Sequence, residues 1–161
     1  NNGVADLTMG LTVTRGRKSW GGNEFVKIGT WKGNAWCLFW GENLCAESLG
    51  VIGLGNIGKE VAKRAVSFVL RVFYNNRKRL SENIEKQYKV SYLDFKELIA
   101  NCKFIVLLLP LTKKSKYLFT KRIFQKMRND SFLINVARGK IIKEVDLVDA
   151  LVKKKNRRSS T

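Results

Sequence analysis

The 161-residue chain has the length of one domain, and its 45% apolar content excludes disorder along the whole sequence. One proline and 13 glycines exclude collagen-like and proline-rich architectures, and no apolar run approaches the ~20 residues that a membrane helix needs. The net charge is +18 and histidine is absent, which excludes imidazole catalysis and histidine-bound zinc within these residues.

Residues 1–47 as a whole show no regular hydrophobic pattern. Residues 4–11 favour a helix with Leu7 and Leu11 on one face, since the two lie about one turn apart. Residues 20–40 hold all four tryptophans among glycines, and we predict an extended loop or an interface there. Because exposed tryptophan-rich surface usually marks a partner surface or a missing domain, we interpret residues 1–47 as an interdomain or dimerisation segment.

In residues 48–152, short apolar runs alternate with amphipathic helical patterns. The predicted strands are 49–53, 70–74, 89–90, 104–109 and 131–136. The predicted helices are 59–69, 81–88, 91–102, a helix that Thr120 caps, and 144–152. Strands that alternate with helices favour right-handed crossovers and a parallel sheet covered on both faces. We therefore predict a doubly wound α/β domain over 48–152, followed by a basic, disordered tail over 153–161.

Two of these helices carry more detailed expectations. Ser91 and Asp94 have the spacing of a capping box at the start of helix 91–102. The last helix, 144–152, has an apolar side that is expected to face inward. That side consists of Leu147, Val148, Leu151 and Val152.

The segment Gly53-Leu54-Gly55-Asn56-Ile57-Gly58 follows a predicted strand and opens a predicted helix, as a dinucleotide-binding fingerprint requires. Gly53 permits the tight turn, Gly55 lets the backbone approach a pyrophosphate, and Gly58 lets the helix pack closely. The helix N-terminus presents free N–H groups to the anion. Leu54 to Gly58 are therefore candidate cofactor contacts, the alternative being an ordinary strand–helix turn.

In NAD-binding proteins an acidic residue about 20 positions further on binds the adenosine ribose. The end of the second predicted strand has no carboxylate and carries Asn76, Arg77, Lys78 and Arg79. This pattern is typical of a site for a 2′-phosphate, so we predict that NADP(H) is preferred and NAD(H) possible. Asn76 would donate to a phosphate oxygen, Arg77 and Arg79 would neutralise the charge, and Lys78 would face solvent. The alternative is a basic turn in a basic protein.

Four segments occur in an order that resembles a known family: 4–8, 50–58 (GVIGLGNIG), 98–112 (LIANCKFIVLLLPLT) and 135–151 (NVARGKIIKEVDLVDAL). The sequence is similar, from about residue 4 to 153, to the D-isomer-specific 2-hydroxyacid dehydrogenases, and among them to glyoxylate/hydroxypyruvate reductases and 2-ketogluconate reductases. The resemblance implies an NAD(P)-dependent oxidoreductase that reduces 2-ketoacids to D-2-hydroxyacids, and a homodimer.

The resemblance also implies roles for single residues. Arg138, in the N-x-A-R-G motif, would be catalytic: it would hold the substrate carboxylate and polarise the neighbouring ketone, besides contacting the cofactor. Val136 and Ala137 would line the nicotinamide pocket through their backbone. The residues that would border the cofactor after the fourth strand are Leu109, Pro110 and Thr112.

The sequence also departs from the family pattern. The family's acid–base histidine and its partner glutamate lie C-terminal to the matched region, and half of the substrate domain precedes it. We therefore expect a dinucleotide-binding domain that is truncated at both ends, incomplete at the C-terminal strands and inactive alone. The alternative is a non-catalytic dinucleotide-binding or dimerisation module. Lys103 stands where an aspartate is usual.

The charge and the cysteines bear on partners and location. A net charge of +18 could attract nucleic acid or anionic membranes. However, the basic residues are spread along the chain without the aromatic interleaving of an RNA-binding sheet. A Lys- and Asn-rich background explains them more simply, so we expect neither a membrane nor a nucleic-acid partner. Cys37, Cys45 and Cys102 lack metal-site spacing, and their odd number favours a reducing compartment, the cytoplasm.

Overall fold

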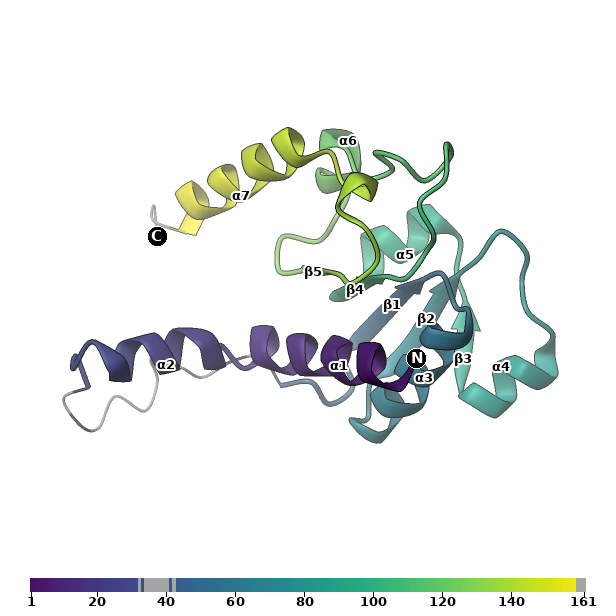
Figure 1. Ribbon diagram of the computed structural model, residues 1–161, viewed down its shortest axis with the longest axis horizontal. Helices are drawn as coiled ribbons and strands as arrows, with labels where there is room; N and C mark the ends of the chain where they lie inside the picture. Colours follow the sequence, from purple (N-terminus) through teal and green to yellow (C-terminus); the bar gives the residue numbers. More distant parts are fainter. Residues whose placement is uncertain (32, 34–40, 42, 159–161) are drawn as a thin grey trace.

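The computed structural model describes residues 1–31, 33, 41 and 43–158 (Figure 1). Within these residues, five parallel strands form one sheet in the order β3-β2-β1-β4-β5. The strands are β1 (Ser48–Ile52), β2 (Arg71–Asn75), β3 (Val90–Tyr92), β4 (Phe104–Leu107) and β5 (Phe132–Asn135). The chain builds outward from β1 to β3, then returns to place β4 on the other side of β1, which confirms the predicted doubly wound sheet.

Helices connect and cover the strands (Figure 1). In chain order they are α1 (Asn2–Gly16), α2 (Ser19–Lys27), α3 (Asn56–Ser67), α4 (Glu82–Tyr88), α5 (Phe95–Asn101), α6 (Lys121–Phe124), the 3-10 helix η1 (Gly139–Ile141) and α7 (Glu144–Arg158). None of the helices in the described part of the chain is long and apolar enough to cross a membrane.

The core lies on both faces of the sheet because strand side chains alternate between them. Leu49 and Val51 of β1 pack with α1 and α3 in one buried cluster. Ile52 of β1 and Ile105 of β4 belong to a second cluster, with α5. All five residues of β1 are buried, as expected for a central parallel strand that is covered on both sides.

The predicted helix over 4–11 is present as part of α1, but the face that carries Leu7 and Leu11 is not the buried one. Leu7 and Leu11 are 56% and 38% exposed. The buried face instead contains Ala5, Thr8 and Thr12. The two threonine hydroxyls donate to the carbonyl oxygens of Val4 and Thr8, at 2.7 and 2.8 Å, so these polar groups are satisfied inside the helix. Small and self-bonded side chains let α1 pack closely against α3.

The region predicted to be an extended loop contains a helix, α2, which continues outward from α1 (Figure 1). Val26 and Ile28 near its end are exposed, as is Trp31. The predicted tryptophan-rich surface also involves Trp36 and Trp40, which lie outside the described residues. The segment was predicted to be an extended loop or an interface because its glycines leave no clear helical period, yet an α-helix of nine residues forms over Ser19–Lys27.

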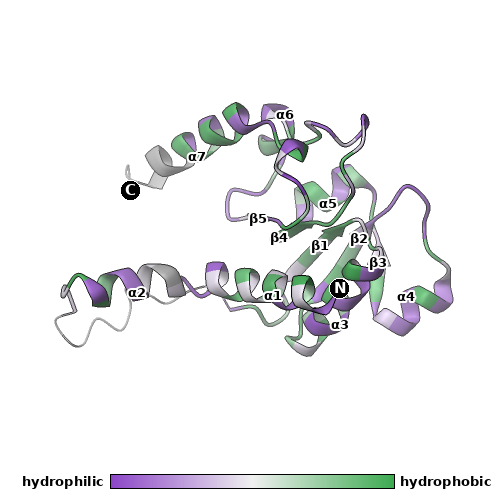
Figure 2. Cartoon of the chain, viewed as in Figure 1, coloured by the Kyte–Doolittle hydropathy of each residue, from purple (hydrophilic) through white to green (hydrophobic). Residues whose placement is uncertain are grey.

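The last helix differs from the prediction in length and in burial. α7 continues to Arg158, so residues 153–158, predicted to be disordered, are helical. Leu147 is partly buried, but Val148, Leu151 and Val152 are 54%, 56% and 52% exposed. The helix lies against α6 and projects away from the sheet, with apolar residues along it (Figures 1 and 2). The inward face predicted for these three residues is therefore wrong.

The start of α5 is also different from the prediction. Ser91 belongs to β3, and Asp94 is the N-cap, whose Oδ1 accepts a hydrogen bond from the backbone N–H of Lys96 at 3.3 Å. The helix therefore begins at Phe95, four residues later than predicted. A short strand competes successfully for Ser91 because Val90 and Ser91 pair with Val72 and Phe73 of β2.

Candidate functional site

The glycine-rich turn lies where the sheet reverses its order, between the carboxyl ends of β1 and β4. Gly53 has φ +100°, which L side chains rarely adopt. Its N–H donates to the carbonyl oxygen of Asn75 at 3.0 Å, and a Cβ on it would lie 3.0 Å from the backbone of Leu108. The turn is therefore packed directly against the chain that leaves β4, at the position where doubly wound sheets bind ligands.

The other two glycines differ in what surrounds them. A Cβ on Gly58 would lie 2.8 Å from the carbonyl oxygen of Gly53, so helix α3 can approach the turn only with glycine there. A Cβ on Gly55 would meet no atom within 4 Å. Gly55 is the N-cap of α3, whose first turn contains no acidic residue and has free N–H groups. Open space beside an electropositive helix end fits the pyrophosphate of a dinucleotide.

Asn76 follows β2 and reaches back to this turn. Its Oδ1 accepts a hydrogen bond from the Leu54 N–H at 2.7 Å, and its Nδ2 donates to the Leu54 carbonyl oxygen at 3.4 Å. The side chain is partly buried. Asn76, predicted as a phosphate contact, thus lies beside the turn, and both of its polar atoms contact the turn's backbone.

The three basic residues after Asn76 are exposed but do not behave alike. Arg79 donates from Nε and Nη2 to the two oxygens of Glu85, each at 2.9 Å, and lies over the ring of Tyr92. Arg77 and Lys78 remain at the surface of the loop between β2 and α4. The predicted basic cluster therefore divides into two exposed cations and one arginine that is paired with α4.

Sequence reasoning missed the cluster that holds Arg79. Glu85 accepts a further hydrogen bond at 2.6 Å from the hydroxyl of Tyr74, whose side chain is fully buried. Arg79 and Tyr74 lower the pKa of Glu85 to about 2 through these bonds. Burial, followed by the bond to Glu85, raises the pKa of Tyr74 to about 12. A glutamate in the first turn of a short helix is a common pattern, so the sequence offered no specific signal for this contact.

We predict that the stability of the fold depends on pH through the Glu85 carboxylate. Its pKa falls from 4.5 to about 2 on folding, so its contribution is complete above pH 4.5 and disappears as the pH falls towards 2. Chemical unfolding between about pH 5 and about pH 2 should show a steeper loss of unfolding free energy in the wild type than in Glu85→Gln. Glu82→Gln is the control, since that carboxylate is 82% exposed. Equal slopes for wild type and Glu85→Gln would contradict the prediction.

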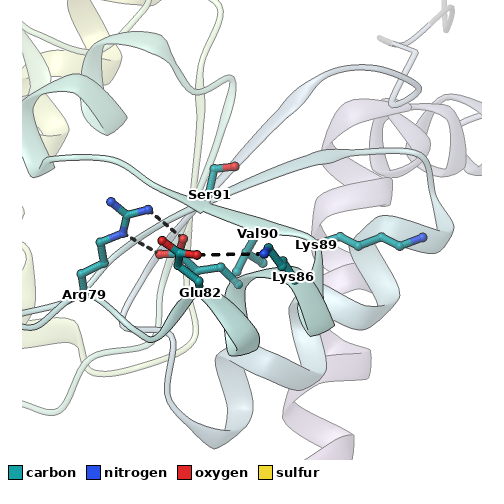
Figure 3. Close-up of a pocket in the computed structure, with 7 residues that line it drawn as sticks. Arg79, Glu82, Lys86, Lys89, Val90 and Ser91 are labelled. Carbon is teal, nitrogen blue, oxygen red and sulfur yellow. Dashed lines mark hydrogen bonds and ion pairs between the residues drawn. The ribbon is translucent and has the colours of Figure 1, made fainter.

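A hollow of about 320 Å³ lies beside this cluster, lined by residues of α4 and β3; Figure 3 shows these side chains. Its lining residues are Arg79, Glu82, Glu85, Lys86, Lys89, Val90 and Ser91. Two of its cations are already matched by acids: Arg79 pairs with Glu85, and Lys86 lies 4.0 Å from Glu82. This hollow is at the edge strand β3 and not at the switch point, so it is not the candidate cofactor site.

The segment after β5 carries Arg138, which is exposed. Its Nη1 donates to the carbonyl oxygen of Ala137 at 2.8 Å. Asn135, at the end of β5, braces the loop from both sides: Oδ1 accepts from the Ala137 N–H at 3.1 Å, and Nδ2 donates to the Arg138 carbonyl oxygen at 3.0 Å. In the sequence Asn135 is only part of the N-x-A-R-G motif, and its hydrogen bonds to Ala137 and Arg138 are known only from the structure. Val136 is partly buried in the same loop.

The segment after β4 is held by Ser115, which sequence reasoning also missed. Ser115 is buried, and its Oγ accepts from the Thr112 N–H and donates to the Pro110 carbonyl oxygen, both at 2.7 Å. Leu109 is partly buried, while Pro110 and Thr112 are exposed. Because the strands are parallel, the predicted residues after β1, β2, β4 and β5 all lie at the carboxyl edge of one sheet.

Among the residues that the structure describes, no group of three or more Cys, Asp or Glu side chains is placed to hold a metal ion. At the carboxyl edge of the sheet, the backbone N–H groups that open α3 and the exposed guanidinium of Arg138 can bind anions. Both kinds of group suit a nicotinamide dinucleotide and a carboxylate substrate.

The sequence and the fold of this chain are similar to those of known proteins. Residues 9–159 match the family model "D-isomer specific 2-hydroxyacid dehydrogenase, NAD binding domain". The glyoxylate reductase of Thermococcus onnurineus is 34% identical over 154 residues, which cover 93% of this chain and 46% of that protein. The glyoxylate/hydroxypyruvate reductase B of Pectobacterium atrosepticum is 34% identical over 151 residues, with coverages of 93% and 47%.

A solved structure agrees with these sequence relatives. The crystal structure of a glyoxylate reductase from Paecilomyes thermophila has a TM-score of 0.86 and 31% identity, over 96% of this chain and 46% of that one. The chain thus spans just under half the length of the relatives it matches. The glycine-rich turn, the Arg138 loop and the sheet order occur together in a sequence that this family model matches almost throughout. The chain therefore belongs to the D-isomer specific 2-hydroxyacid dehydrogenases and carries their NAD-binding domain.

Proposed function

We propose that this chain is the dinucleotide-binding part of an enzyme that reduces 2-ketoacids such as glyoxylate, hydroxypyruvate or 2-ketogluconate to D-2-hydroxyacids with NADPH. The observation that carries the proposal is the open space at Gly55, beside the N-terminus of α3 and at the sheet's switch point. The names of relatives, glyoxylate reductase and glyoxylate/hydroxypyruvate reductase, support the substrate class.

The roles of this chain's residues follow from their chemistry. The nicotinamide cofactor, when bound, supplies the hydride. The backbone at Gly55 and the first N–H groups of α3 bind its pyrophosphate. The guanidinium of Arg138 holds the substrate carboxylate with paired hydrogen bonds and stays charged at any physiological pH. These 161 residues contain no histidine, so we assign the proton donor to residues of the complete protein outside this segment.

The preference for NADPH rests on Arg77 and Lys78, which are exposed beside Asn76. Arg79 contributes less than expected from the sequence, because Glu85 holds it. A loop with cations and without a carboxylate attracts a 2′-phosphate instead of repelling it. We expect NADPH to bind at least ~10-fold more tightly than NADH, about 1.4 kcal/mol, and the ratio to shrink at high salt.

Titration of both dinucleotides into the chain tests this preference. Arg77→Ile should weaken NADPH binding by roughly 10-fold and leave NADH binding unchanged, because only NADPH carries the phosphate. Arg122→Ile on α6 is the matched control, an exposed arginine away from β2. Equal affinities for the two dinucleotides, or tighter NADH, would show that the basic loop is only surface.

A non-catalytic dinucleotide-binding or dimerisation module is the second candidate, favoured by the absence of histidine. The complete protein decides between the two candidates. Reduction of glyoxylate or hydroxypyruvate with NADPH supports the enzyme, and dinucleotide binding without turnover of any 2-ketoacid supports the module.

We also propose a homodimer in a reducing compartment, the cytoplasm. The dimer would bury the exposed apolar residues of α1, α2 and the turn after α2, which are Leu7, Leu11, Val26, Ile28 and Trp31. Sedimentation of the complete protein as a monomer would contradict it. The cysteines that the structure describes, Cys45 and Cys102, are free thiols, which supports the reducing compartment.

A further inference from the structure

We infer that Asn76 is a positioning residue that holds the glycine-rich turn in its binding conformation, so that it governs affinity for NADH and NADPH alike. This inference rests on the proposed function, because it assumes that the turn binds a dinucleotide. It assigns Asn76 a role different from the 2′-phosphate contact that the sequence predicts. The two roles differ in which cofactor they affect.

The side-chain amide of Asn76 bonds to both backbone polar groups of one residue, Leu54. Oδ1 accepts from the Leu54 N–H at 2.7 Å, and Nδ2 donates to the Leu54 carbonyl oxygen at 3.4 Å. Leu54 is the residue between the first two glycines, and its side chain is 2% exposed in the core cluster on the α1 and α3 side. The turn is thus held in two ways: the Leu54 side chain is buried in the core, and the amide of Asn76, which follows β2, bonds to the Leu54 backbone.

A second contact links the same two segments. The Gly53 N–H donates to the Asn75 carbonyl oxygen at 3.0 Å, continuing the pairing of Ile52 with Asn75 at the ends of β1 and β2. The turn residues Gly53 and Leu54 are therefore both bonded to the residues that end β2. Since Gly55 has no neighbour within 4 Å of its Cβ position, the contacts at Leu54 set where the open part of the turn begins.

Ordering a binding loop before the ligand arrives increases affinity, because less conformational freedom is lost on binding. The pyrophosphate that the turn binds is common to NADH and NADPH, whereas the 2′-phosphate is not. Loss of a positioning residue must therefore weaken the binding of both dinucleotides, and loss of a phosphate contact must weaken the binding of NADPH alone. This difference makes the inference testable.

Two substitutions separate the functions of the Asn76 amide. Asn76→Ala removes the acceptor and the donor. Asn76→Asp keeps an oxygen that can accept from the Leu54 N–H, and adds a negative charge that repels a 2′-phosphate. Asn101→Ala is the matched control, because that exposed asparagine donates to Glu97 within α5, away from the turn.

The experiment titrates NADH and NADPH into the full chain and its variants, and follows hydrogen exchange of the Leu54 amide without ligand. We expect Asn76→Ala to lose at least ~10-fold in affinity for both dinucleotides and its Leu54 amide to exchange at least ~10-fold faster. Asn76→Asp should restore NADH affinity and Leu54 protection while NADPH stays weakened. Asn101→Ala should match the wild type in every measurement.

The outcomes are distinguishable. Loss of NADPH affinity alone in Asn76→Ala, with unchanged exchange at Leu54, would overturn the inference in favour of a phosphate contact. If Asn76→Ala does not fold, Asn76→Asp decides, since it must keep Leu54 protected and NADH bound. If the wild type binds neither dinucleotide, the proposed function fails, while Leu54 exchange still reports whether Asn76 holds the turn.

Discussion

Gly55→Ala is expected to weaken binding of nicotinamide dinucleotides by roughly 10- to 100-fold, about 1.4–2.8 kcal/mol, without destabilising the fold. The added methyl group would occupy space that no atom of the chain uses within 4 Å, so it displaces only a ligand. Gly55 has a negative φ of −87°, which alanine can adopt. Replacing glycine at such a position should leave the free energy of unfolding unchanged or raise it by ~0.4–1 kcal/mol.

Gly58→Ala is the comparison variant for Gly55→Ala. Its methyl group would lie 2.8 Å from the backbone oxygen of Gly53, so the turn or helix α3 must move. Overpacking of this kind costs ~1–3 kcal/mol, and the variant should lose both stability and affinity. Urea unfolding and dinucleotide titration of both variants make the measurement. Wild-type affinity in Gly55→Ala would mean that no ligand approaches the turn there.

Lys103→Ala is expected to lower the free energy of unfolding by about 3 kcal/mol. The side chain is 5% exposed, and its Nζ lies 3.0 Å from Oε1 of Glu47 and 3.9 Å from Oδ2 of Asp130. Removing one partner of a buried ion pair leaves the other charge without compensation and creates a cavity. Glu47 is 29% exposed and can take up water, which puts the expected loss at the lower end of the range for buried pairs.

Two variants show whether burial is the cause. Lys103→Met keeps the apolar stem and should recover a part of the lost stability, because the cavity is filled. Lys153→Ala removes an ion pair of equal length, 3.0 Å to Asp149, whose partners are 60% and 40% exposed. It should change the unfolding free energy by less than ~0.5 kcal/mol. Similar losses in Lys103→Ala and Lys153→Ala would exclude burial as the source of the effect.

The glycine-rich turn was predictable because its information is local. The spacing of Gly53, Gly55 and Gly58 between an apolar run and an amphipathic pattern predicts a turn that leads from a strand into a helix, and the structure requires glycine at Gly53 and Gly58. The helix begins at Asn56, three residues before the predicted start. The parallel, doubly wound sheet was predictable from the alternation of strands and helices, since parallel strands are joined by helical crossovers of one hand, whereas the order of the strands comes from the structure. Arg138 was proposed as a catalytic residue because of the family resemblance of the N-x-A-R-G motif, and it lies after β5.

The partners of side chains were decided by the tertiary structure. Arg79 pairs with Glu85, and Asn76 contacts Leu54, because folding brings β2 beside α4 and beside the turn after β1. A sequence contains many arginines and acids, and the spacing along the chain does not state which of them meet. The basic loop therefore looked uniform in sequence, although it contains an internally paired arginine and two exposed cations.

The sequence alone predicts the strands of the sheet, most of the helices that join them and the glycine-rich turn, because helical periodicity, strand alternation and glycine spacing act over a few residues. It misses the helix over Ser19–Lys27, where glycines leave no clear period. Which helix faces are covered depends instead on how the helices pack in the folded chain. Thr8 and Thr12 are buried in α1 while Leu7 is exposed, and Val148 and Leu151 are exposed on α7. Periodicity marks an apolar face, but burial depends on whether another element lies against that face, and this is a property of the whole packed molecule.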